Sequence, residues 1–221
     1  ARTTDLREVR IEDLLYREPV AIDMEALSDL IEGRRVWVTG AGGSIGSELA
    51  RQVAQLAPNH LFLIDSSEGA LFQTERHLAE DEVSPVVDVA VVDLRRTGRV
   101  EELMQANPPD VIFHAGAHKH VGMMERQPRE AFSNNTMVTL ELARLAVAHG
   151  AASFCLISTD KAVEPSNVMG ATKRLAEKAI QALIDAGAAG STTFSIVRFG
   201  NVIGSSGSVI PIFEQQIAEG R

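Results

Sequence analysis

Short apolar runs rich in β-branched residues alternate with longer helical patterns from Arg34 onward, and this alternation constrains the fold most strongly. Strands that alternate with helices are typical of βαβ units, which build a parallel sheet. Most of the runs are apolar throughout, as expected of strands that helices cover on both faces. The sequence therefore predicts an α/β fold with a doubly wound parallel sheet. Its strands are expected over Arg35–Thr39, His60–Asp65, Val86–Val92, Asp110–Ala115, Ala152–Ser158 and Thr192–Phe199.

The segments between these runs predict helices over Ser44–Leu56, Ser67–Ala79, Arg99–Gln105, Glu130–Ala148 and Asn167–Asp185. The first 33 residues do not follow the alternation. There, Ile11–Leu15 and Met24–Ile31 predict two short helices. We interpret residues 1–33 as a helical arm that packs on the main domain or on a neighbouring subunit, and residues 34–221 as one domain.

Charge and cysteine content exclude several classes of protein. With 21 Lys and Arg against 30 Asp and Glu, the net charge is −9, so a phosphate-neutralising surface for nucleic acid is not expected. The single cysteine, Cys155, allows neither an internal disulfide nor a cysteine-based zinc site, which fits a reducing compartment. Charged residues crowd the first fifteen positions, and no apolar run reaches the ~18 residues of a membrane span. We therefore expect a soluble, cytoplasmic chain.

A glycine-rich loop, Gly40-Ala41-Gly42-Gly43-Ser44-Ile45-Gly46, joins the first predicted strand to the first long helix. Glycines let a pyrophosphate approach the backbone, and a helix N-terminus offers it unpaired N–H groups. The next strand ends in Asp65, 19 residues after Gly46, where a carboxylate accepts hydrogen bonds from an adenosine ribose. A glycine-rich string alone is also compatible with an ordinary tight turn, but this context predicts a Rossmann-type dinucleotide site.

Asp65 also bears on the choice of dinucleotide. Its carboxylate would repel a 2′-phosphate, and Ser66, Ser67 and Glu68 supply no arginine to receive one. NAD is therefore favoured over NADP. At the end of the third strand, Asp93 is placed either to reach the adenine amino group or to remain a solvated strand-end residue.

Three further motifs follow predicted strands: His114-Ala115-Gly116-Ala117, Ser158-Thr159-Asp160-Lys161 and Arg198-Phe199-Gly200-Asn201. Together with the spacing Gly40-x-x-Gly43-x-x-Gly46, they resemble the extended short-chain dehydrogenase/reductase superfamily. Within it, Ala117-His118-Lys119-His120-Val121, the Asp160-Lys161 pair and the run from Gly204 to Pro211 are similar to the nucleotide-sugar 4,6-dehydratases of the CapD-like polysaccharide-biosynthesis family. The resemblance covers roughly Val9 to Gly220.

One substitution points to a smaller group of relatives within this superfamily. The superfamily's Tyr-x-x-x-Lys motif is present as Met169-Gly170-Ala171-Thr172-Lys173, so the tyrosine base is absent. This change resembles the large, membrane-associated UDP-N-acetylglucosamine 4,6-dehydratases that retain the configuration at sugar carbon 5. Such relatives imply a smaller substrate lobe, expected after Arg221 and largely absent from this sequence. They also imply that a parent protein is anchored at the inner face of a membrane by an N-terminal region not found here.

The implied reaction moves a hydride from sugar carbon 4 to NAD, eliminates water across carbons 5 and 6, and returns the hydride to carbon 6. By the resemblance, Asp160 is the acid toward the carbon 6 hydroxyl and Lys161 is the base at carbon 5. Thr159 would hydrogen-bond the carbon 4 oxygen, and Lys173 would contact the nicotinamide ribose. We expect a water held by Thr159 or Asp160 to accept the proton of the carbon 4 hydroxyl. Adjacent titratable groups with separated pKa values suit such a division.

The resemblance also implies binding residues and partners. A UDP-sugar is the implied substrate, a homo-oligomer is the implied assembly, and Asn135 would support the backbone of the active site. No metal is expected, because His118 and His120 have no third ligand at local spacing. The implied cofactor contacts are Gly40, Gly43, Ser44, Ile45, Gly46, Asp65, Asp93, Leu94, Ala115, Ala117 and Lys173, and the implied substrate contacts are Lys119, Asn201 and Ser208.

Each of these residues also has an ordinary structural interpretation. Without the motif context, Asp160 and Lys161 are a solvated ion pair, Thr159 caps a turn, Lys173 is an exposed helix lysine and Lys119 belongs to a surface loop. Three alternative functions stay open: a nucleotide-sugar 4-epimerase, a dehydratase that inverts carbon 5, and an NAD-binding module without catalytic activity.

Overall fold

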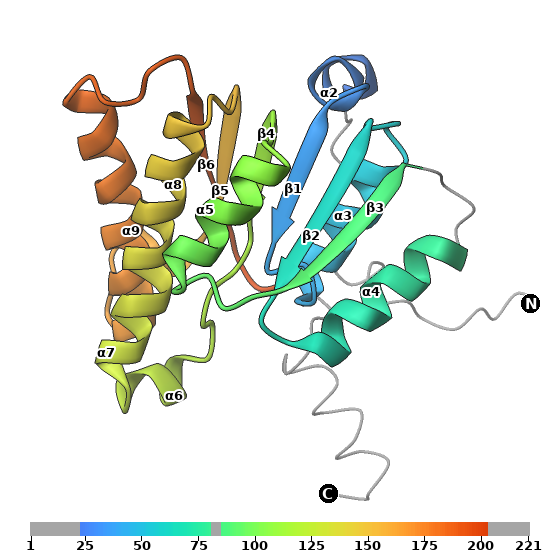
Figure 1. Cartoon of the computed structure of the whole chain (residues 1–221). Helices are drawn as coiled ribbons and strands as arrows, with labels where there is room; N and C mark the ends of the chain where they lie inside the picture. The colour runs from blue at the N-terminus through green and yellow to red at the C-terminus, as the bar shows by residue number, and fades with distance from the viewer. Residues whose placement is uncertain (1–22, 81–84, 203–221) are drawn as a thin grey trace, which may run out of the picture.

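A computed structural model describes residues 23–80 and 85–202. Six strands form one sheet in the order β3-β2-β1-β4-β5-β6, and every neighbouring pair is parallel (Figure 1). The predicted doubly wound parallel sheet is confirmed, and each strand ends within one residue of its predicted bounds. The strands are β1 (Arg35–Thr39), β2 (His60–Asp65), β3 (Val86–Val91), β4 (Val111–His114), β5 (Ser153–Thr159) and β6 (Thr193–Phe199).

Helices connect these strands and cover the sheet. Asn167 caps the longest of them, because its side chain accepts a hydrogen bond from the backbone N–H of Gly170 at 2.8 Å. The sequence predicted neither the helix over Val121–Glu125 nor the single 3-10 turn over Asp160–Ala162. The α-helices are α2 (Met24–Ile31), α3 (Ser44–Ala54), α4 (Glu68–Glu80), α5 (Thr97–Ala106), α6 (Val121–Glu125), α7 (Pro128–Ala131), α8 (Val138–Ala148) and α9 (Val168–Asp185).

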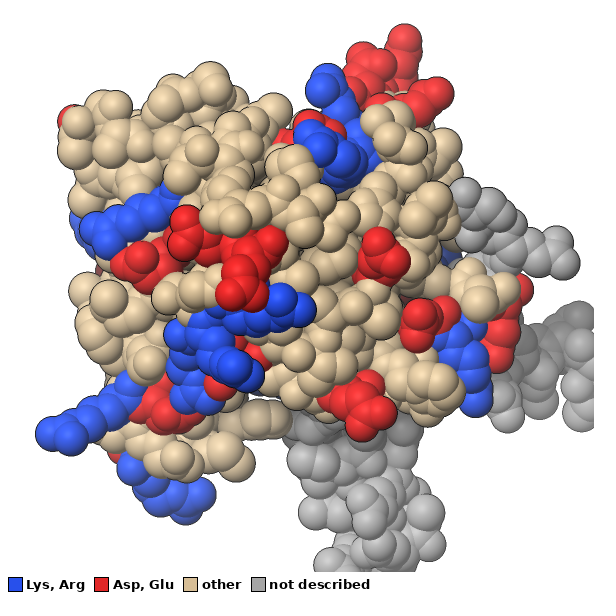
Figure 2. Space-filling view, viewed as in Figure 1, with Lys and Arg blue, Asp and Glu red and all other residues tan. Residues whose placement is uncertain are grey.

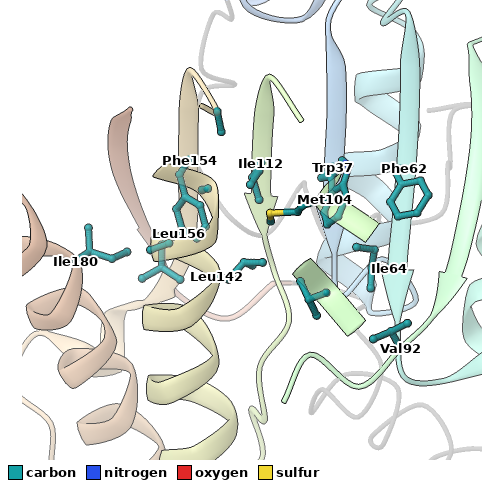
Figure 3. Packing of buried hydrophobic residues seen from close by; sticks show 14 of the residues in the cluster. Trp37, Phe62, Ile64, Val92, Met104, Ile112, Leu142, Phe154, Leu156 and Ile180 are labelled. Atoms are coloured by element: carbon teal, nitrogen blue, oxygen red, sulfur yellow. The ribbon is translucent and has the colours of Figure 1, made fainter. Parts of the chain in front are cut away.

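Two buried apolar layers lie on opposite faces of the sheet. One packs α5, α8 and α9 on residues such as Trp37, Ile112 and Phe154 (Figure 3). The other packs α3 and α4 on Val36 and Val38, the strand neighbours of Trp37. Successive side chains of a strand point to opposite faces, so an uninterrupted apolar strand supplies both layers at once. The central strands are therefore buried on both sides, as predicted.

At the two edges of the sheet this prediction is wrong. In β3 the side chains of Val86 and Val91 are 64% and 52% exposed, and in β6 that of Val197 is 44% exposed. In the described part of the chain each of these strands has a neighbouring strand on one side only. Apolar composition alone does not distinguish an edge strand from a central one.

The predicted helix over Glu130–Ala148 is also wrong in its middle. The chain forms α7, then a π-helix over Phe132–Met137, and then α8. The widened turn contains Ser133, Asn134, Asn135 and Thr136, which are weak helix formers whose side chains compete for backbone hydrogen bonds. Such π-turns occur frequently at functional sites.

The N-terminal arm is described from residue 23 onward. Its second predicted helix is confirmed as α2, whose Ile31 is 1% exposed and packs with Val36 and Leu61 in the core. The predicted helix over Ile11–Leu15 lies outside the described residues. The division at residue 33 stays a prediction.

The surface carries charges of both signs side by side, as Figure 2 shows for one face. Surface pairs such as Arg99 with Glu102 and Arg144 with Glu141 join neighbouring turns of one helix. Exposed pairs of this kind contribute little to stability. Among the described residues, no helix combines the length and apolar character needed to cross a membrane.

Candidate functional site

The glycine-rich loop lies at the point where the strand order reverses. β1 pairs with β2 on one side and with β4 on the other, so the chain crosses the sheet between β3 and β4. Ligands of open α/β sheets bind at such a switch point, outside the carboxyl ends of the strands. The loops that follow β1 and β4 meet there.

Two glycines of the loop leave no room for a side chain. Gly40 has φ +71°, and a Cβ there would lie 2.5 Å from the backbone nitrogen of Gly116. A Cβ on Gly46 would lie 2.0 Å from the carbonyl oxygen of Gly40. This close packing places the first turn of α3, which begins at Ser44, against an open cavity. The N–H groups and the dipole of a helix N-terminus favour an anion at that position.

Neighbouring elements hold the loop in this shape. The carboxylate of Asp65 accepts hydrogen bonds from the N–H groups of Gly42 at 3.0 Å and Ser67 at 2.9 Å. The buried hydroxyl of Thr74, on α4, donates to the carbonyl oxygen of Ala41 at 3.0 Å. Sequence reasoning missed Thr74, because one helical threonine among polar neighbours has no recognisable pattern.

A cavity of about 240 Å³ lies beside the ends of β2 and β3. Asp93 is held at its wall by Arg95, whose guanidinium lies 2.6 Å from the carboxylate and also pairs with Glu130 of α7. The hydrogen bond from Arg95 lowers the pKa of Asp93, so this group is a carboxylate. The predicted cofactor contacts in this wall are Gly40, Gly43, Asp65, Asp93, Leu94, Ala115 and Ala117.

A larger cavity of about 860 Å³ joins the glycine loop to the ends of β5 and β6 and the start of α9. It brings together residues that are more than 150 positions apart in the sequence, from Gly43 to Asn201. The predicted site residues that line it are Gly43, Ser44, Ile45, Gly46, Ala115, Ala117, Lys119, Thr159, Lys161, Lys173 and Asn201.

At the end of β5, Thr159, Asp160 and Lys161 form one hydrogen-bonded group. The Thr159 hydroxyl accepts from the N–H of Lys161 at 3.4 Å and donates to Asp160 Oδ1 at 2.9 Å. The Lys161 ammonium donates to Asp160 Oδ1 at 3.1 Å and to Asn201 Oδ1 at 3.2 Å. Hydrogen bonds from Lys161 and Thr159 lower the pKa of Asp160. Thr159 therefore caps the turn, one of its two interpretations, while its hydroxyl also reaches the carboxylate.

Lys173 is 3% exposed, so its interpretation as an exposed helix lysine is wrong. Its Nζ donates to the carbonyl oxygen of Ile157 at 2.7 Å and lies in the wall of the larger cavity. Burial lowers the pKa of Lys173 to about 8, although the charge of Glu177 opposes this shift. A lysine at this pKa is still mostly protonated at pH 7.

A fully buried histidine lies behind the cavity wall. His114, at the end of β4, is held between the hydroxyls of Thr39 at 2.7 Å and Thr139 at 3.1 Å. Burial and the charge of Lys173 lower the pKa of His114 to about 3, which keeps the ring neutral. The imidazole therefore ties β1 and β4 to the helical layer through neutral hydrogen bonds.

The π-helix presents Asn135 to the loop after β4. The amide of Asn135 accepts from the N–H of His118 at 2.8 Å and donates to its carbonyl oxygen at 3.1 Å. It also donates to the hydroxyl of Thr172 on α9 at 3.1 Å. Asn135 thus holds the backbone of this loop, the role that the family resemblance implies.

The side of the cavity nearest the start of α9 is apolar. Met169 stands at the motif position of the missing tyrosine, is 5% exposed and packs with Met124 and Ala131. Met123 and Met124, from the unpredicted helix α6, line the same wall. No sequence signal indicated these two residues.

Two predicted residues are not placed in the cavity wall. Asp160 is absent from the cavity wall, and its side chain is 54% exposed beside Lys161. Ser208 lies outside the described residues. Within residues 23–80 and 85–202, no three His, Cys, Asp or Glu side chains are grouped to hold a metal ion.

Comparison with known proteins identifies the family. The model of the polysaccharide biosynthesis protein family matches residues 36–221. The chain belongs to this family. Its relatives include the capsular polysaccharide biosynthesis protein CapD of Staphylococcus aureus, with 44% identity over 98% of this chain, and the probable polysaccharide biosynthesis protein EpsC of Bacillus subtilis, with 45% identity over 97%. The chain spans 36% of the length of each of these two relatives.

More distant relatives of this polysaccharide biosynthesis protein are named nucleotide-sugar dehydratases and epimerases. The UDP-N-acetylglucosamine 4,6-dehydratase (inverting) of Campylobacter jejuni is 30% identical and matches 86% of this chain and 56% of its own length. The UDP-glucose 4-epimerase of Rickettsia canadensis is 32% identical and matches 85% of this chain and 54% of its own length. The chain is therefore similar to proteins named for both reactions.

Solved structures agree on the fold. Pen from Bacillus thuringiensis aligns with a TM-score of 0.79 and 34% identity, covering 86% of this chain and 59% of that one. The dTDP-glucose 4,6-dehydratase DesIV from Streptomyces venezuelae, solved with NAD and TYD bound, aligns with a TM-score of 0.71 and 21% identity, covering 84% and 62%. The similarity to DesIV establishes a shared Rossmann-type fold.

Proposed function

We propose that this chain is the cofactor-binding and catalytic part of an NAD-dependent UDP-N-acetylglucosamine 4,6-dehydratase that retains the configuration at carbon 5. The protein would act in the synthesis of a surface polysaccharide. One observation carries this proposal: Lys161, whose ammonium donates to Asp160, lines the same cavity as the glycine loop and Lys173, and Met169 stands where the superfamily has its tyrosine. The dehydratase and epimerase relatives support the class of substrate.

The residues present fit a dinucleotide. Gly40 and Gly46 carry no side chain and the backbone packs closely at both positions. A pyrophosphate can therefore approach the first turn of α3 directly. Asp65 stands at the end of β2, where it can accept hydrogen bonds from the adenosine ribose. Lys173 lines the adjoining cavity, and we assign to it the contact with the nicotinamide ribose. Bound NAD would supply the acceptor and donor of hydride for the redox steps at sugar carbons 4 and 6.

The first proton transfer is assigned to Thr159 and Asp160. Oxidation at carbon 4 releases the hydroxyl proton, and Met169 offers no group that could accept it. The Thr159 hydroxyl lies 2.9 Å from Asp160 Oδ1. Lys161 lowers the pKa of Asp160, so this group is ionised before the reaction and carries no proton of its own. Thr159 would pass the carbon 4 proton to Asp160, directly or through one water.

The elimination then uses the proton that Asp160 has gained. The ketone at carbon 4 acidifies the carbon 5 proton, which Lys161 removes in its neutral form. Asp160 donates its proton to the departing carbon 6 hydroxyl, and water leaves. Asp160 is then a carboxylate again. Return of hydride to carbon 6 would restore oxidised NAD, and return of the carbon 5 proton restores the neutral Lys161. Asp160 begins the cycle as a carboxylate, so the ammonium proton of Lys161 leaves to solvent before the elimination, and Lys161 then acts as the neutral amine.

The test uses a longer version of the protein that includes the segments found in full-length relatives. Wild type incubated with UDP-N-acetylglucosamine in deuterated solvent should give a 4-keto-6-deoxy sugar by NMR. Lys161→Ala and Asp160→Asn should each lower turnover by about 10²–10⁴ while substrate binding is kept, because both groups act mainly in the transition state. Lys178→Ala, on the exposed face of α9, is the matched control.

The two variants differ in one further observable. Lys161→Ala should still form the reduced cofactor, seen at 340 nm, but should not incorporate deuterium at carbon 5. Asp160→Asn should do neither, since the carbon 4 proton then has no acceptor. Wild-type exchange in Lys161→Ala would refute the role of Lys161. A carbon 4 epimer as product would indicate the epimerase instead, and NAD binding without turnover would indicate a module without catalytic activity.

A further inference from the structure

Glu177 is a buried carboxylate that the proposed reaction does not use. Its side chain is 4% exposed, and it lies on α9 one helical turn after Lys173. Residues four apart on a helix are neighbours on the same face. A buried charge requires partners, because desolvation of an unpaired carboxylate is strongly unfavourable.

Three side chains from three elements supply those partners. Ser158 of β5 donates to Glu177 Oε1 at 2.6 Å, and Arg198 of β6 donates to the two carboxylate oxygens at 2.8 and 2.5 Å. Arg174 of α9 donates at 3.1 Å. Burial raises the pKa of Glu177, whereas the hydrogen bonds from Arg198, Ser158 and Arg174 lower it. The hydrogen bonds have the larger effect together, so the net shift is downward. Glu177 is therefore ionised at neutral pH.

The charge of Glu177 opposes the effect of burial on the Lys173 ammonium. Its ammonium makes one hydrogen bond, to the carbonyl oxygen of Ile157, among the contacts that the structure gives for it. Burial favours the neutral amine, and Glu177 favours the ammonium. The one other titratable group that interacts with it from behind the wall is His114, which is neutral. The remaining ionisable groups of the described cavity wall are His118, Lys119, His120 and Lys161.

We propose that Glu177 is a positioning residue that acts through Lys173: its buried carboxylate keeps the lysine of the cavity wall in the ammonium form. Ser158 and Arg198, which hold the carboxylate, directly precede the strand ends that carry Thr159 and Phe199. The charge of Lys173 is thus tied to the same two strands that position Lys161 and Asn201. Its consequence for NAD binding rests on the proposed function, whereas the charge of Lys173 does not.

The chain itself allows a direct measurement. It contains four lysines, Lys119, Lys161, Lys173 and Lys178. Carbon-13 labelling of lysine Cε gives four signals to titrate by NMR, and Lys173→Arg assigns the signal of interest. The measurement compares wild type with Glu177→Gln, which keeps the shape of the side chain and removes its charge. Asp185→Asn, at the exposed end of α9, is the matched control.

Glu177→Gln should move the Lys173 midpoint down from about 8 by about one pH unit, because an opposite charge one helical turn away favours the ammonium form. Arg198→Gln should move it up, since it removes the cation that offsets Glu177. Asp185→Asn should leave it unchanged. If Glu177 and Arg198 had a structural role alone, the Lys173 midpoint would move in the same direction in both variants or would not move in either. Each of these results would overturn the proposal. If one variant does not fold, a Lys173 midpoint in the other that stays unchanged or moves in the opposite direction still overturns the proposal.

NAD titration of the same samples separates the two levels of inference. If Lys173 binds the cofactor as an ammonium, the pH above which wild-type affinity declines should fall in Glu177→Gln and rise in Arg198→Gln. Wild type that binds no NAD would contradict the proposed function and leave the NMR result standing. Binding whose pH dependence does not follow the Lys173 midpoint would overturn the proposed action of Glu177 on the site.

Discussion

Gly46→Ala adds one methyl group at the most crowded point of the glycine loop. The new Cβ would lie 2.0 Å from the Gly40 carbonyl oxygen and 2.9 Å from Ala41 Cα, and both are backbone atoms that cannot rotate away. Overpacking of this kind costs about 1–3 kcal/mol. Gly69→Ala adds the same methyl group in α4, where nothing lies within 4 Å, and should stabilise the helix by about 0.5–1 kcal/mol.

Urea denaturation followed by circular dichroism measures both changes in the free energy of unfolding, and calorimetry measures NAD binding. We expect Gly46→Ala to be less stable than wild type and to bind NAD at least about tenfold more weakly, which corresponds to ~1.4 kcal/mol. Gly69→Ala should bind NAD as wild type does. Equal stability and equal NAD affinity in Gly46→Ala would show that the loop does not pack as described, and the reasoning would be refuted.

Two further predictions concern Asp65 and His114. Asp65→Ala should weaken NAD binding by about 1.5–3 kcal/mol, because a charge-assisted hydrogen bond to the ribose is lost, and unchanged calorimetric affinity would contradict that assignment. His114 has a folded-state pKa of about 3 against an ordinary value of 6.5, so the unfolded chain binds the extra proton between these pH values and stability declines as pH falls through that window. The decline from this residue should approach about 1.4 kcal/mol per pH unit below pH 6.5, and acid titration of His114→Gln should show a correspondingly smaller slope.

Local sequence patterns determined the sheet and the cofactor loop. Each strand of the sheet was predictable within one residue, because an apolar run between turn residues has few alternatives to a buried strand. The glycine spacing followed by Asp65 indicated the nucleotide site for the same reason: both features lie within one βαβ unit and depend on residues close in sequence. Helix α2 was predicted with its observed bounds.

Tertiary structure decided how the far-apart motifs combine. The sequence placed Asp160 and Lys161 in one active-site pair, whereas the fold turns Lys161 toward Asn201 and the cavity and leaves Asp160 more exposed. It also placed Lys173 on a helix without indicating that it would be almost fully buried. Side-chain direction at a strand end depends on the following turn and on neighbouring strands, which a single sequence does not specify.

The partners of buried polar groups were likewise decided only by the fold. In the sequence, Glu177 is indistinguishable from the other acidic residues of an amphipathic helix. In the fold it accepts hydrogen bonds from Ser158 and Arg198, which lie on two different strands. Asn135 meets His118 from within a π-helix that the sequence did not predict. Apolar burial is non-directional and leaves a periodic pattern in the sequence, whereas a hydrogen bond is directional and requires a partner at a particular distance. Periodicity therefore determined the layers of this protein, and three-dimensional packing determined which polar groups meet within them.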